Sequence, residues 1–190
     1  MHTNDVAGPP TPLVPPPWLI RLAEPDGADL DLVHRWMLAP HVSAFWHQAW
    51  TRDRWAEELR RQLSGDHSRP FLLVRDGITL AYLEVYRSVR DPVGACYPVR
   101  PDDLGVHVAI GDPAATGRGA GTVLLRAVAD GLLAADPACT RVIAEPDIAN
   151  QPSIRAFGHA GFRRVGKIAI GEKQAVLLVR ARTEADLPAL

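Results

Sequence analysis

The chain has 190 residues, of which 47% are apolar and 23% charged, the composition of one soluble globular domain with its own core. Because 21 Lys and Arg nearly balance 22 Asp and Glu, nothing favours nucleic acid or a membrane surface as partner, and a small molecule is expected. Cys96 and Cys139 lie far apart, which argues against a disulfide framework or a structural zinc site and favours a cytoplasmic protein. No apolar run approaches the length of a membrane span.

Prolines are concentrated at the start of the chain. Seven of the 17 prolines lie in the first 25 residues, mostly in the run GPPTPLVPPPW. Because proline fixes φ and cannot donate a ladder hydrogen bond, this run is expected to be extended. We therefore expect three parts: a leader over 1–17 that packs loosely on the rest, one domain over 18–183, and a tail over 184–190.

The first half of the chain predicts strands and helices in alternation. Apolar runs bounded by Gly, Pro and Asp predict strands, and apolar residues three and four apart predict helices. In order, we expect a strand over 18–24, helices over 29–38 and 51–63, and strands over 70–77 and 78–88. Asp76 and Gly77 form the strongest hairpin signal in the chain. The segment 41–47, rich in aromatic residues and histidines, is expected to connect the two helices.

The second half of the chain predicts a different alternation. We expect a strand over 104–110, a helix over 122–134, a strand over 141–145, a helix over 150–160, and strands over 163–170 and 174–182. Pro152 suits the first turn of its helix and Gly161 suits the end of that helix. An antiparallel meander followed by strands that alternate with helices implies an α/β fold with one mixed sheet and helices on its faces.

The segment 111–121 is rich in glycine and opens a predicted helix. Unpaired backbone N–H groups at the positive end of a helix dipole suit a phosphate or pyrophosphate. Gly117, Gly119 and Gly121 would let the backbone approach such an anion, and Arg118 would add a positive charge. The segment lacks the Gly-Lys-Ser/Thr of a P-loop and the GxGxxG spacing of a Rossmann turn. From spacing alone, a pyrophosphate cradle and an ordinary strand-to-helix turn are equally compatible with it.

Two segments together resemble the GCN5-related N-acetyltransferases. TGRGAG at 116–121 resembles their Arg/Gln-x-x-Gly-x-Gly/Ala acyl-CoA loop, and NQPSIRAFGHAGF at 150–162 resembles their Asn-x-x-Ala-Ile-x-x-Tyr-x-x-x-Gly-Phe signature. DLGVHVAI at 103–110 and EPD at 145–147 resemble the members that build siderophore hydroxamates, as in mycobactin and aerobactin assembly. The sequence departs from the family at two positions. Thr116 replaces the usual Arg or Gln, and Phe157 replaces the tyrosine that protonates the leaving thiolate in many members.

The resemblance implies a central, mostly antiparallel twisted sheet with a parallel pair of strands at the acyl-CoA site. It also implies acyl-CoA as a co-substrate and no metal. The backbone at 108–110 would orient the pantetheine arm and polarise the thioester carbonyl, and Asn150 would hydrogen-bond that arm. The expected acyl-CoA-binding residues are Val108, Ala109, Ile110, Thr116, Gly117, Arg118, Gly119, Ala120, Gly121, Thr122 and Asn150.

Acyl transfer from a thioester to nitrogen needs a group that takes the proton lost by the nitrogen. His107 is the expected base, because it lies in the strand that leads to the glycine-rich segment and an unperturbed imidazole is mostly neutral at pH 7. Asp147, just after the neighbouring strand, would fix the tautomer of His107 or position the amine. Without the motif, a structural role on a half-buried strand would be the favoured interpretation of His107, and the motif reverses that preference. For Asp147, a turn or helix cap is the alternative.

Aromatic and acidic residues are expected around the acceptor amine. Tyr82, Glu84 and Tyr86 alternate along one predicted strand and so share one face of it. A carboxylate between two tyrosines suits a cationic amine, although aromatic side chains more often pack in the core. The expected acceptor-binding residues are Trp46, His47, Tyr82, Glu84 and Tyr86. His34, His67 and His159 are expected on the surface and are assigned no role.

We therefore expect an acyl-CoA-dependent N-acyltransferase that transfers an acetyl- or succinyl-type group to an N-hydroxylated diamine, N-hydroxylysine or N-hydroxyornithine. The product would be a hydroxamate for a siderophore. An N-hydroxylamine is less basic than an alkylamine and arrives uncharged, so a single histidine suffices as base. Two alternatives stay open: an aminoglycoside-type N-acetyltransferase, and a non-catalytic acyl-CoA-binding sensor. A monomer and a homodimer are both compatible with the sequence.

Overall fold

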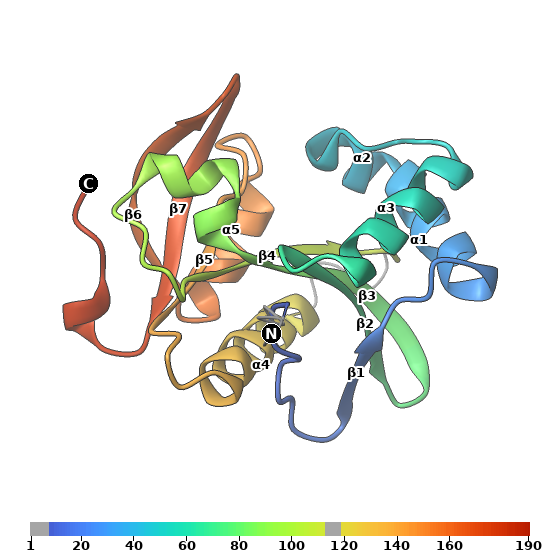
Figure 1. Cartoon of the computed structure of the whole chain (residues 1–190), viewed down its shortest axis with the longest axis horizontal. Helices are drawn as coiled ribbons and strands as arrows, with labels where there is room; N and C mark the ends of the chain where they lie inside the picture. Colours follow the sequence, from blue (N-terminus) through green and yellow to red (C-terminus); the bar gives the residue numbers. More distant parts are fainter. Residues whose placement is uncertain (1–7, 113–118) are drawn as a thin grey trace, which may run out of the picture.

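The computed structural model describes residues 8–112 and 119–190, which form a seven-stranded sheet covered by helices. The strands lie in the order β1-β2-β3-β4-β5-β7-β6 (Figure 1). Their bounds are β1 Trp18–Leu22, β2 Ser68–Arg75, β3 Ile78–Arg87, β4 Leu104–Ile110, β5 Arg141–Ala144, β6 Arg163–Ile170 and β7 Lys173–Ala181. Neighbouring strands are antiparallel except β4 and β5, which are parallel. The predicted mixed sheet with one parallel pair is confirmed.

The helices follow the predicted pattern with one addition. The α-helices are α1 Gly27–Leu38, α2 Pro40–Trp46, α3 Arg52–Ser64, α4 Ala120–Ala135 and α5 Gln151–His159, and the 3₁₀ turns are η1 Ser88–Arg90, η2 Pro92–Cys96 and η4 Glu184–Asp186. Helix α2 occupies the segment that was expected only to connect two helices. Pro40 begins α2, where a missing N–H costs no hydrogen bond, and His47 ends it in the left-handed conformation, with φ 53°. So short a helix offers too few residues to show helical periodicity.

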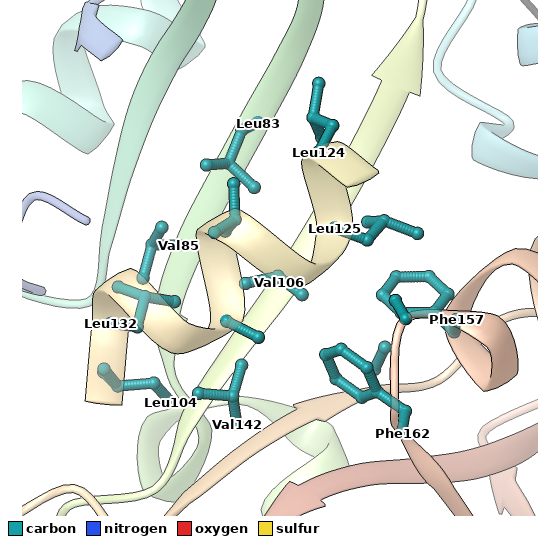
Figure 2. Close-up of a cluster of buried hydrophobic side chains, with 14 of the residues drawn as sticks. Leu83, Val85, Leu104, Val106, Leu124, Leu125, Leu132, Val142, Phe157 and Phe162 are labelled. Carbon is teal, nitrogen blue, oxygen red and sulfur yellow. The ribbon is translucent and has the colours of Figure 1, made fainter. Parts of the chain in front are cut away.

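The main hydrophobic core lies between the sheet and helices α4 and α5. Figure 2 shows α4 side chains against β3 and β4, with two phenylalanines beside them. The labelled residues are Leu83, Val85, Leu104, Val106, Leu124, Leu125, Leu132, Val142, Phe157 and Phe162. Within the described part of the chain, no helix combines the length and apolar character that crossing a membrane requires.

The described part of the proline-rich segment packs on the outer side of α4. The Leu13 N–H donates to the Gly131 carbonyl at 3.1 Å. A Cβ atom added to Gly131 would lie 2.6 Å from the Leu13 carbonyl oxygen, so only glycine allows this approach. The described part of this segment therefore makes one close backbone contact with α4.

Two further hydrophobic clusters cover the opposite face of the sheet. Helices α1, α2 and α3 pack over β2, β3 and β4 around Trp55, Leu72 and Tyr82. A separate cluster, which includes Tyr86 and Leu177, lies between η2 and the half of the sheet that contains β5, β6 and β7. Tyr82 belongs to one cluster and Tyr86 to the other. Glu84, between them on β3, therefore lies where the two clusters separate.

The parallel strands β4 and β5 are joined only at their beginnings. Leu104 pairs with Val142 and Gly105 with Ile143, whereas β4 continues to Ile110 after β5 has ended. At the paired end, buried Arg141 donates from Nε and Nη2 to the two carboxylate oxygens of Asp103, at 2.8 and 2.5 Å. This ion pair ties the two strands together at the point from which the sheet opens.

Candidate active site

The centre of the opened sheet holds a histidine between two carboxylates. His107 on β4 pairs with Glu84 on β3, and its Nδ1 lies 3.2 Å from Glu84 Oε2. On its other side, His107 Nε2 lies 2.5 Å from Oε1 of Glu145, the residue that follows β5. The side chain of His107 is 33% exposed, while that of Glu145 is 4% exposed. A buried carboxylate therefore holds each ring nitrogen, and solvent still reaches the ring.

Hydrogen bonds from neighbouring side chains hold both carboxylates in place. Glu84 Oε1 accepts from Tyr82 OH at 3.0 Å and from Gln62 Nε2 at 2.8 Å. Glu145 Oε2 accepts from Tyr86 OH at 2.6 Å, and Lys173 Nζ lies 3.7 Å from Glu145 Oε1. Since most of their acceptor positions are filled, both carboxylates are stabilised in the charged form.

These contacts determine the protonation of His107. Burial alone would lower the pKa of the imidazole, but Glu145 and then Glu84 outweigh burial and raise that pKa to about 10. Burial likewise opposes ionisation of Glu145, yet His107, Lys173 and Tyr86 lower its pKa to about 2. The resting site therefore holds an imidazolium between two carboxylates. The sequence had suggested a neutral imidazole, because neither carboxylate was identified as a partner of His107.

The histidine lies in the wall of a cavity of 340 Å³ on the face that carries α1, α2 and α3. The predicted residues in its lining are Trp46, His47, Glu84, Tyr86, His107, Val108, Asp147 and Asn150. The lining also has an excess of acids, with carboxylates at Glu58, Glu84, Asp91, Glu145 and Asp147. The fixed positive charges in the lining are those of Arg61 and Lys173, and His107 adds a third when protonated. We call this space the acceptor-side cavity.

A second cavity, of 430 Å³, lies between α2, the end of β4, the first turns of α4 and helix α5. The predicted acyl-CoA-binding residues in its lining are Val108, Ala109, Ile110, Gly119, Gly121, Thr122 and Asn150. The start of a helix and the free edge of a strand both suit a ligand with phosphates and amide groups. We call this space the donor-side cavity. The two cavities share six lining residues and adjoin there. These residues are Phe45, Trp46, Val108, Asn150, Ser153 and Phe157.

Some predicted residues lie elsewhere or outside the described chain. Thr116, Gly117 and Arg118 fall outside the described residues, and Ala120 begins α4. Tyr82 is fully buried and does not line the acceptor-side cavity, although it shares a face with Glu84 as predicted. Its contribution is therefore to hold Glu84.

Asp147 does not make the contact with His107 that was considered for it. Its Oδ1 accepts the Ala149 N–H at 2.7 Å, the turn role that the sequence left open. The carboxylates that hold the histidine ring are Glu84 and Glu145 instead. Asp147 still lines the acceptor-side cavity.

The sequence reading missed several residues of the site. Glu145 was noted in the sequence only as part of the EPD segment. The parallel register that pairs Gly105 with Ile143 places Glu145 beside His107 two residues later, and that register is set by the folded sheet. No sequence pattern indicated that Gln62 belongs to the site. Its amide is buried on a face of α3 that is otherwise apolar, and helical periodicity identifies only the apolar residues of such a face. Two histidines assigned to the surface also line cavities, His67 on the acceptor side and His159 on the donor side.

Two cavities that meet beside a histidine and two carboxylates suit the transfer of a group between two bound molecules. The acetyltransferase (GNAT) domain family matches residues 26–170. Lysine N-acyltransferase MbtK of Mycobacterium sp. (strain MCS) is 33% identical over 183 residues, covering 96% of this chain and 75% of the relative. The chain therefore belongs to the GNAT family. It is an N-acyltransferase with a fold that binds acyl-CoA.

Other relatives and solved structures agree with this assignment. N(6)-hydroxylysine O-acetyltransferase of Escherichia coli is 29% identical, with 85% of this chain and 51% of the relative covered. N-hydroxyputrescine acetyltransferase of Acinetobacter baumannii is 29% identical, with 78% and 71% covered. An uncharacterized protein of Bacillus halodurans has a TM-score of 0.83 at 25% identity, with 93% and 92% covered. Aminoglycoside acetyltransferase AAC(6')-Ib with coenzyme A and kanamycin shares the fold, with a TM-score of 0.74 at 22% identity and 87% and 95% covered.

Proposed function

We propose that the protein transfers an acetyl- or succinyl-type group from acyl-CoA to the nitrogen of an N-hydroxylated diamine, N-hydroxylysine or N-hydroxyornithine. The product is a hydroxamate for siderophore biosynthesis. The observation that carries this proposal is His107, held by Glu84 and Glu145 in the wall of a cavity that adjoins the donor-side cavity. Relatives named for N-hydroxylysine and N-hydroxyputrescine acetylation support an N-hydroxylated acceptor.

The proposed reaction assigns the proton of the acceptor nitrogen to His107. The nitrogen lone pair attacks the thioester carbon, the new N–C bond forms and the C–S bond breaks. The attacking nitrogen becomes strongly acidic as it gives up its lone pair, and neutral His107 takes its proton. Because Glu84 and Glu145 favour the imidazolium, the enzyme reaches its active protonation state as the pH rises above neutrality. The nitrogen of an N-hydroxylamine is already uncharged above neutral pH, so no second base is needed.

The charge of the acceptor-side cavity supports a cationic acceptor. Carboxylates outnumber the fixed cations in its lining, and Glu58 and Asp91 line this cavity but not the donor-side cavity. A second amino group of a diamine or amino acid would carry a positive charge at neutral pH. We propose that these acids and Asp147 position it, while Trp46, His47 and Tyr86 form the walls.

The donor-side cavity is proposed to bind acyl-CoA. The backbone of 108–110, on the free edge of β4, and Asn150 would hold the pantetheine arm. The glycine-rich segment 116–121 and Thr122 would bind the phosphates at the start of α4, where the helix dipole is positive.

A thiol-release assay tests the proposal. Acetyl-CoA and succinyl-CoA are crossed with N-hydroxycadaverine, N-hydroxyornithine, N-hydroxylysine and their parent amines, and the products are identified by mass spectrometry. We expect a hydroxamate with at least one N-hydroxylated acceptor, and a lower kcat/KM with its parent amine. His107→Gln should lower kcat by about 10²–10⁴-fold, the usual contribution of a general base. His34→Gln, outside both cavities, is the matched control.

Aminoglycoside acetylation is the second candidate, and the acidic lining of the acceptor-side cavity favours it. Kanamycin is therefore included in the same assay. Turnover of kanamycin without turnover of any N-hydroxylated amine would replace the first proposal with the second. Binding of acyl-CoA without turnover of any acceptor would instead favour a sensor domain.

A further inference from the structure

The junction of the two cavities is where the thioester must lie if the proposed function is correct, because one side holds the acyl donor and the other the nucleophile. Three of the six junction residues, Phe45, Val108 and Phe157, have purely apolar side chains, and Phe157 offers no hydroxyl where many family members have tyrosine. The polar side chains of the junction are those of Trp46, Asn150 and Ser153. Among the described junction residues, Ser153 supplies the one hydroxyl group.

The first turn of α5 has already used its backbone donors. The Ser153 N–H donates to Asn150 Oδ1 at 3.2 Å, and the Gln151 N–H donates to the Ala149 carbonyl at 2.9 Å. Pro152 has no N–H, and the Ile154 N–H donates to the Asn150 carbonyl. In contrast, the Ser153 hydroxyl makes no hydrogen bond with any residue that the structure describes. The hydroxyl is therefore available to a ligand at the junction.

We propose that the Ser153 hydroxyl donates a hydrogen bond to the sulfur of the acyl donor as the C–S bond breaks. The electron pair of that bond moves onto sulfur, and a thiolate at a junction that is half lined by apolar side chains needs a hydrogen-bond donor. Ser153 lies one helical turn before Phe157, so both side chains approach the junction from the same face of α5. Ser153 stabilises the charge, and the proton that His107 takes from nitrogen balances the proton the thiolate gains on release. The inference rests on the proposed function.

The first test measures Ser153→Ala with the acceptor and acyl-CoA that the wild-type enzyme turns over. A hydrogen bond to a charged group stabilises by about 1.5–3 kcal/mol, so kcat should fall by about 10- to 100-fold. The affinity for acyl-CoA, measured by calorimetry, should stay close to wild type, because the bond forms fully only with the departing sulfur. Ser153→Thr keeps the hydroxyl and should retain activity. Ser64→Ala, on α3 outside both cavities, is the matched control.

The second test separates this role from a structural one by changing the leaving group. Acetyl-CoA is compared with the acetyl thioester of thiophenol, whose more acidic thiol needs less stabilisation. The loss of kcat/KM in Ser153→Ala should shrink with the aryl donor, and adding Phe157→Tyr to Ser153→Ala should restore part of kcat with acetyl-CoA. An unchanged kcat in Ser153→Ala, or an equal loss with both donors, overturns the inference while leaving the proposed function intact. Absence of turnover in the wild-type enzyme would overturn the proposed function itself.

Discussion

The arrangement around His107 is an interaction of three ionisable side chains rather than a histidine with one partner. Glu84 and Glu145 each contact one ring nitrogen, and tyrosines hold the outer oxygens of both carboxylates. Because two negative charges face one ring, the positive form of that ring is favoured in the resting enzyme. The same interaction that orients the histidine therefore also limits how much of it is neutral at pH 7.

Replacing Glu145 tests whether the two carboxylates limit the neutral fraction of His107. Glu145→Gln keeps the size of the side chain and removes its charge, so the pKa of His107 should fall from about 10 toward its usual value. If neutral His107 is the base, the rise of kcat/KM with pH should shift to lower pH by one unit or more. Asp53→Asn, on the first turn of α3 outside both cavities, is the matched control. A pH profile that does not move in Glu145→Gln would show that the activity does not depend on neutral His107.

At the scale of elements, the clearest determinant of the open sheet is the ion pair between Asp103 and Arg141. Both side chains are at most 2% exposed, and Tyr97 OH and the Arg100 N–H donate further hydrogen bonds to Asp103. A buried pair is costly to break, because the remaining partner keeps an uncompensated charge.

Asp103→Asn should therefore lower the free energy of unfolding by about 3–5 kcal/mol, measured by urea denaturation. Asp31→Asn is the matched control, since Asp31 forms an exposed pair with Arg52 and should cost at most about 1 kcal/mol. Combining Asp103→Asn with Arg141→Met should recover part of the loss. Equal effects of Asp103→Asn and Asp31→Asn would mean that the buried pair does not hold β4 to β5.

The packing of the proline-rich segment on α4 gives a second prediction for an element. Gly131→Ala places a methyl group 2.6 Å from the Leu13 carbonyl, and overpacking of this kind costs about 1–3 kcal/mol. Gly158→Ala on α5 is the matched control, because a Cβ there meets no atom within 4 Å. Because alanine has a higher helix propensity than glycine, Gly158→Ala should stabilise the protein by at most about 1 kcal/mol. A Gly131→Ala variant as stable as Gly158→Ala would mean that losing the contact with Leu13 costs little free energy of unfolding.

The elements also show what the sequence could predict. Long periodic segments such as α4 and the hairpin at Asp76 and Gly77 were predicted because local patterning determines them. The short helix α2 was missed, and so was the contact of Glu145 with His107, which depends on the strand register. Motifs located the site, whereas its protonation state depends on side chains from β3, β4 and the segment after β5.

For the whole molecule, the charges of His107 and Glu145 make the free energy of unfolding depend on pH. The pKa of His107 is raised from 6.5 to about 10 by folding, so its contribution is fully present below about pH 6.5 and is lost as pH rises through 10. The pKa of Glu145 is lowered from 4.5 to about 2, so its contribution is present above about pH 4.5 and is lost as pH falls through 2. Both contributions are fully present between about pH 4.5 and 6.5, and each declines gradually outside that range.

Thermal unfolding of wild type and His107→Gln measures this dependence. The Tm of the wild-type protein should be higher than that of His107→Gln. The difference in Tm should be largest near pH 6 and should narrow steadily toward pH 10. His34→Gln, outside both cavities, is the matched control. A constant difference between pH 6 and 10 would contradict a raised pKa of His107.

The acids of the acceptor-side cavity have a consequence for how substrates arrive. The formal net charge of the whole chain is −1, so its distant field is weak. A cationic acceptor therefore meets attraction only within about 8 Å of the cavity at physiological salt. Capture of a cationic acceptor would then be set by unguided diffusion, and added salt would speed its escape from the cavity more than it slows its approach.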